Sequence, residues 1–230
     1  MTGLHQGLPR TLLLSLSLVA LAACAGGPDP EASGMSHMYV HYARVGEIHS
    51  AVVDGSIDDT RSPARWLATH RAEEFPAGGQ EALEAMRNEA RIIAAEDDLA
   101  GLGRAVARMG NACGSCHSAL GSGPNITVVE PPPMSSVPSE SMKRHAWASD
   151  RLWEGLVGPS AAAWAAGAGA LGSSPMDFGT NDPANRLAMR VQGLSEKAAA
   201  ASTPRDRAAV YGDLLETCSL CHRTLQMRMR

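Results

Sequence analysis

One five-residue pattern, C-x-x-C-H, occurs twice in this chain of 230 residues and contains four of its five cysteines. The two copies are Cys113-Gly-Ser-Cys116-His117 and Cys218-Ser-Leu-Cys221-His222. On a helix, side chains three and four positions apart share a face, so both thiols and the imidazole of one copy can reach a single group. The pattern is typical of covalent haem c attachment, in which the cysteines bind the porphyrin and the histidine binds its iron. The sequence therefore predicts two haems, with His117 and His222 as the proximal iron ligands.

Two other uses of these cysteines are considered. Four thiolates in two C-x-x-C pairs suit a tetrahedral zinc ion. Four cysteines in an exported protein can also form a disulfide framework. Neither alternative explains why a histidine directly follows both pairs.

The N-terminal segment indicates export. Residues 11–23 form an apolar run with Arg10 as the only basic side chain before it. Thirteen residues are too few to span a bilayer, but they suit the core of a signal peptide. The run ends in Leu-Ala-Ala-Cys24, which resembles the bacterial lipobox, so we expect a lipoprotein signal peptide over 1–23 and lipidation of Cys24. The alternative is an ordinary signal site followed by a chance cysteine.

Export agrees with the haem prediction, because bacteria attach haem c outside the cytoplasmic membrane. We expect a lipoprotein at the periplasmic face of a membrane, and Ala25 slightly favours the outer membrane. The formal net charge is −4 and there is no basic stripe, so a nucleic-acid partner is not expected.

Landmarks recur along the chain at a nearly constant offset. Met38-Tyr-Val-His41 reappears as Met142-Lys-Arg-His145, 104 positions later, and Cys113 corresponds to Cys218, 105 positions later. We interpret this as a tandem duplication. The predicted organisation is a flexible tether over 24–35, a first domain over 36–120, a Pro/Ser-rich linker over 121–139 and a second domain over 140–230.

Helical periodicity and helix-start signals predict four helices in each half and no strand, hence an all-α fold. In the first half the expected helices span 36–53, 56–70 and 80–95, and a fourth runs from Asp97 into the first motif. In the second half they span 140–157, 160–171, 183–201 and 204–227.

A four-helix unit whose last helix ends in C-x-x-C-H resembles the cytochrome c′ family. The segments Arg104-Ala-Val-Ala-Arg-Met-Gly-Asn-Ala-Cys113 and Tyr211-Gly-Asp-Leu-Leu-Glu-Thr-Cys218 look like that family's last helix. The resemblance implies two tandem four-helix bundles, each with a C-terminal haem-binding helix. Members of the family often dimerise through their first two helices, so a homodimer is possible. The tandem arrangement and the lipid anchor depart from the usual member.

The residue opposite the proximal histidine decides the iron chemistry. In the family this sixth position is empty or is taken by a methionine of the first helix. Here His41 and His145 recur in register, and imidazole is a strong iron ligand, so we predict them as distal ligands, with Met38 and Met142 as the fallback pair. The alternative is that both histidines are surface residues. His37 and His70 are expected to be solvated, and His49 to touch the haem edge.

These features predict a dihaem cytochrome with six-coordinate, low-spin iron that carries electrons between redox partner proteins. It is expected to be a carrier rather than an enzyme. One alternative is a five-coordinate protein that binds or detoxifies NO or CO. Another is a dihaem peroxidase with one capped and one open iron.

Overall fold

The computed structural model describes residues 30–70, 76–179 and 182–227, and in these residues all regular secondary structure is helical. The predicted all-α class is therefore confirmed. The eight helices are α1 (Pro30–Val53), α2 (Ile57–Thr69), α3 (Gln80–Ala95), α4 (Leu99–Leu120), α5 (Pro138–Val157), α6 (Ala161–Gly172), α7 (Pro183–Ala200) and α8 (Pro204–Thr224).

The helix boundaries follow from local capping. Side chains of four N-cap residues accept a backbone N–H of the first turn, and these residues are Asp98, Ser160, Asp182 and Thr203. Helix α3 has the predicted bounds, whereas α1 begins at Pro30, inside the expected tether. The lipidation site predicted at Cys24 lies outside the described residues.

The second four helices repeat the spacing of the first four. Helices α1 and α5 end at Val53 and Val157, 104 positions apart, and α4 and α8 begin at Leu99 and Pro204, 105 positions apart. These are the two offsets found between the sequence landmarks. Below, α1–α4 are called the first half and α5–α8 the second half.

Within each half, consecutive helices pack side by side and run antiparallel. In the first half, the start of α3 meets the end of α4, where Gly78 lies beside Leu120, while Arg108 of α4 pairs with Glu89 of α3. In the second half, the indole N–H of Trp164 in α6 donates to a carbonyl near the end of α7 at 2.8 Å. The start of α1 therefore lies at the same end of its half as the end of α4, and α5 and α8 are related in the same way.

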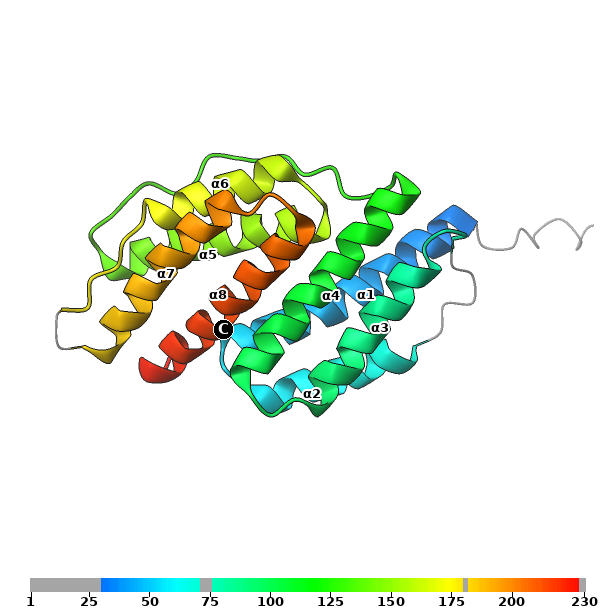
Figure 1. Cartoon of the computed structure of the whole chain (residues 1–230), viewed down its shortest axis with the longest axis horizontal. Coiled ribbons are helices and arrows are strands. Elements are labelled where there is room, and N and C mark those ends of the chain that lie inside the picture. Colours follow the sequence, from blue (N-terminus) through cyan, green and yellow to red (C-terminus); the bar gives the residue numbers. More distant parts are fainter. Residues whose placement is uncertain (1–29, 71–75, 180–181, 228–230) are drawn as a thin grey trace, which may run out of the picture.

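The halves meet mainly where α4 lies along α8. Figure 1 shows these two helices side by side in the middle of the molecule, with α1–α3 on one side and α5–α7 on the other. A Cβ on Gly103 of α4 would lie 2.6 Å from the carbonyl oxygen of Gly212 in α8, so only glycine allows this approach. Residues further along α4, such as Asn111, lie near the start of α8 at Arg205. The two helices therefore run antiparallel, and their C-terminal ends point in opposite directions.

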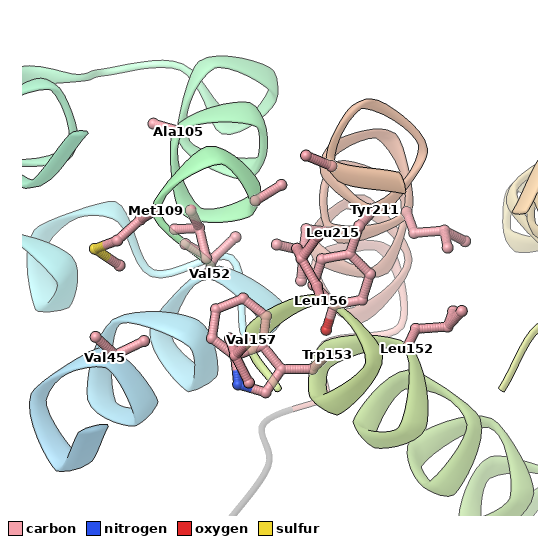
Figure 2. Packing of buried hydrophobic residues seen from close by; sticks show 14 of the residues in the cluster. Val45, Val52, Ala105, Met109, Leu152, Trp153, Leu156, Val157, Tyr211 and Leu215 are labelled. Atoms are coloured by element: carbon pink, nitrogen blue, oxygen red, sulfur yellow. The ribbon is translucent and has the colours of Figure 1, made fainter. Parts of the chain in front are cut away.

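One hydrophobic core continues across the junction of the halves. Figure 2 shows Trp153 of α5 and Tyr211 of α8 pointing toward one another, close to Val52 of α1. Tyr211 is fully buried and Trp153 is 6% exposed. Among the described helices, none is both long and apolar enough to cross a membrane.

Candidate functional site

The first C-x-x-C-H motif occupies the last two turns of α4. Gly121, with a φ of 59°, ends this helix, and the N–H of the following residue bonds to the carbonyl of His117. Burial, followed by the neighbouring Cys116, raises the pKa of the Cys113 thiol to about 12. The Nδ1 atom of His117 lies 2.7 Å from the carbonyl oxygen of Val157, so Nε2 is the ring nitrogen that this contact leaves available.

The second motif lies in the last two turns of α8, where Cys221 and His222 are buried. Burial, followed by Cys221, raises the pKa of Cys218 to about 12. Burial lowers the pKa of His222, while the Asp54 carboxylate and the Val53 carbonyl act in the opposite direction. Its Nδ1 lies 3.9 Å from an Asp54 oxygen and makes no close hydrogen bond.

Each motif therefore faces the end of the first helix of the other half. His117 of α4 meets Val157 at the end of α5, and His222 of α8 meets Val53 at the end of α1. The residue that follows the first cysteine of each motif also contacts the end of the first helix of the other half. Ser219 donates to the carbonyl of Val52, and a Cβ on Gly114 would collide with the carbonyl of Leu156. Since Val53 and Val157 are equivalent positions of the repeat, the two sites have the same cross-half construction.

This arrangement bears on the alternatives for the cysteines. In the described residues none of the four motif cysteines takes part in a disulfide. Because α4 and α8 run antiparallel, the two C-x-x-C pairs lie at opposite ends of the helix pair. A single four-thiolate zinc site and a disulfide between the motifs are therefore wrong. Two thiols and an imidazole form a donor set that fits one haem c at each end, and at the first end Nδ1 of His117 is held by the Val157 carbonyl.

His41, the predicted distal ligand of the first half, lies in a cluster of imidazoles. One ring nitrogen from each of His37, His41 and His70 lies within 4.8 Å of the other two. His41 is 5% exposed, and its Nε2 has no hydrogen-bond partner. Burial, followed by the two neighbouring histidines and Arg87, lowers its pKa to about 4. A neutral imidazole with an unpartnered nitrogen is the form that binds metals.

His145, the counterpart in the second half, is also buried, but its surroundings differ. Its Nε2 lies 2.5 Å from the carbonyl oxygen of Ser174, which follows α6. Burial lowers the pKa of His145, and the Ser174 carbonyl acts against this shift. The alternative that His41 and His145 are surface residues is therefore wrong. Of the fallback pair, Met38 is 38% exposed and Met142 is half-buried.

The sequence reasoning missed two groupings of side chains. It expected His37 and His70 to be solvated, whereas both are half-buried beside His41. The spacing of four between His37 and His41 on one helix was the available signal. It also missed that Nε2 of His49 lies 2.7 Å from the hydroxyl of Tyr211 in the other half.

The His49–Tyr211 pair predicts acid sensitivity. Burial lowers the pKa of His49 from 6.5 to about 4. Between these two values the unfolded chain binds a proton that the folded chain does not, so the free energy of unfolding should fall as the pH falls through this window. A His49→Gln variant keeps a polar partner for Tyr211 but cannot titrate, so it should lose less stability on acidification. Urea unfolding at pH 7 and at about pH 4.5 checks this, and an identical loss in both proteins would contradict it.

Comparison with known proteins gives no relative. No family model matches the chain, and neither a curated protein nor a solved structure matches it.

Proposed function

We propose that this protein is a dihaem c-type cytochrome that carries electrons between redox partners outside the cytoplasmic membrane. We propose that its halves are two tandem four-helix bundles of cytochrome c′ type, each binding one haem c. One observation supports this most strongly: both C-x-x-C-H motifs end a long helix, and both place their histidine against the valine that ends the first helix of the other half.

The residues of each motif have separate tasks. The two thiols provide covalent attachment, as Cys113 and Cys116 would in the first half. The Val157 carbonyl accepts the Nδ1 proton of His117, which fixes the ring orientation and leaves Nε2 for the iron. When bound, haem supplies a one-electron iron couple whose potential depends on axial ligands, hydrogen bonding and burial.

The sixth ligands complete the proposal. His41 and His145 lie on the first helix of their halves, which begins at the end where the motif of the same half lies. Both are buried and have lowered pKa values, so they are neutral at pH 7. We propose them as distal ligands that make both irons low-spin, with Met38 and Met142 as the fallback.

The placement of the motifs at opposite ends of the α4–α8 pair suggests how a carrier would work. Each haem would lie near its own end of the molecule, so one partner can approach each end. Lipidation of Cys24 would hold the protein at the periplasmic face of a membrane, with the outer membrane slightly favoured. The partners would be redox proteins that bind transiently.

The visible spectrum of the purified protein tests the proposal. We expect two haems per chain and, after reduction, the sharp bands of low-spin haem. His41→Ala and His145→Ala should each convert one haem to the high-spin spectrum, and Tyr39→Ala, at a 70% exposed position of α1, is the control. A chain without haem would overturn the proposal.

The structure also supports a second candidate, a protein that binds NO or CO. Nε2 of His145 is already engaged by the Ser174 carbonyl, which favours an open iron in the second half. Rapid binding of CO to one reduced haem, unchanged by His145→Ala, would favour this function over electron transfer.

A further inference from the structure

We infer that Trp153 and Tyr211 form an aromatic bridge that carries electrons between the two haem sites. This inference rests on the proposed function, because it requires a haem at each motif. It concerns the side chains between the two motifs, none of which is proposed as an iron ligand or an attachment site.

The bridge begins one helical turn before the first motif. A Cβ on Gly110 would lie 2.6 Å from Cζ3 of Trp153, so the indole packs directly on the backbone of α4. Gly110 precedes Cys113 by one turn of the same helix, a rise of about 5 Å. The absence of a side chain at Gly110 is what lets an aromatic ring of the second half approach this attachment site.

A second contact brings the same indole close to Cys113 from α1. Tyr42 of α1 lies near both Trp153 and Cys113, since both act on the pKa of its hydroxyl. Burial is the main cause that raises the pKa of Tyr42. Trp153 thus contacts two helices that adjoin the first attachment cysteine.

The bridge continues from Trp153 to the second motif. The ring centroids of Trp153 and Tyr211 lie 5.7 Å apart with an interplanar angle of 26°, an offset-stacked arrangement. Tyr211 precedes Cys218 by two turns of α8, a rise of about 10 Å, and Figure 2 shows its side chain close to that of Trp153. His49 holds the Tyr211 hydroxyl at 2.7 Å and keeps the ring fixed.

Aromatic residues are scarce in this chain, so the stacking of two of them between the motifs calls for a reason. Aromatic residues make up only 4% of the sequence, yet two of them stack at the junction of the halves. Their positions do not follow from the repeat, since the equivalents are His49 for Trp153 and Val106 for Tyr211. Tunnelling falls steeply with distance and is faster through delocalised π orbitals than through saturated side chains.

The proposed transfer moves one electron and changes no covalent bond. With a haem bound at each motif, the two rings would lie on the path by which one electron passes from the reduced half to the oxidised half. Both rings stay neutral, because burial raises the pKa of the Tyr211 hydroxyl and the indole does not titrate at these pH values. No proton transfer is needed.

Exchange between the haems of the half-reduced protein tests the bridge. Exchange broadening of the haem methyl signals in NMR spectra reports its rate even when the two potentials are equal. We expect severalfold slower exchange in Trp153→Leu and Tyr211→Leu, and a smaller effect in Trp153→Phe, which keeps a ring. The visible spectra of the variants should stay those of low-spin haem, because neither side chain is assigned to iron.

Trp164→Leu is the matched control. Trp164 is 2% exposed and lies in α6, where its indole bonds to the carbonyl of Ala198 and takes no part in the path between the motifs. Unchanged exchange in Trp153→Leu, or equal slowing in Trp164→Leu, would overturn the bridge while two haems per chain still support the proposed function. A chain without two haems would overturn both.

Discussion

Replacing both Cys113 and Cys116 by alanine should reduce the haem content from two per chain to one. Without thiols the first motif cannot form thioether bonds, while Cys218 and Cys221 lie at the opposite end of the α4–α8 pair and keep their attachment. Alanine is a strong helix former, so α4 should persist without the thiols. Intact-protein mass and the haem absorbance per chain measure the outcome.

The control for this prediction is Ser115→Ala in the same motif. The Ser115 hydroxyl bonds only to the carbonyl of Asn111 on its own helix, so this variant should keep both haems. The reciprocal replacement of Cys218 and Cys221 should also leave one haem. Two haems remaining in either double variant would show that attachment does not use these thiols.

Local signals in the sequence predicted most of the helix boundaries. The bounds of α3 were predicted to the residue, and its buried side chains Leu83, Met86, Ala90 and Ile93 recur at helical spacing. The helix predicted over 204–227 does begin at Pro204, where the Thr203 hydroxyl accepts the N–H of Asp206. Such signals depend only on residues a few positions apart, so a single sequence is enough to detect them.

The contacts between the halves were not predictable in this way. An internal repeat indicates that two units are alike, but it does not say which faces meet. The pairing of His117 with Val157 and of His49 with Tyr211 joins residues 40 and 162 positions apart. The same limit applies to His41 and His145, which recur in register but have different neighbours, the imidazoles of His37 and His70 in one half and a Ser174 carbonyl in the other.

Gly103→Ala should lower the free energy of unfolding by about 1–3 kcal/mol, the range for overpacking a tight interface. The added Cβ would meet the Gly212 carbonyl oxygen at 2.6 Å and the Glu216 nitrogen at 3.2 Å. Both are backbone atoms of α8, so the contact can be relieved only by moving the two helices apart. Denaturant unfolding of the haem-loaded protein measures the change.

The same substitution at Gly193 is the matched control. Gly193 lies inside α7, and a Cβ there would meet nothing within 4 Å. Alanine should therefore raise the free energy of unfolding by roughly 0.5–1 kcal/mol, because glycine loses more conformational freedom in a helix. The same Gly→Ala change should therefore lower the free energy of unfolding at Gly103 and raise it at Gly193. Equal changes in the free energy of unfolding would show that α4 and α8 do not pack backbone to backbone. Because these two helices end in the motifs, Gly103→Ala should also alter interhaem exchange, whereas Gly193→Ala should not.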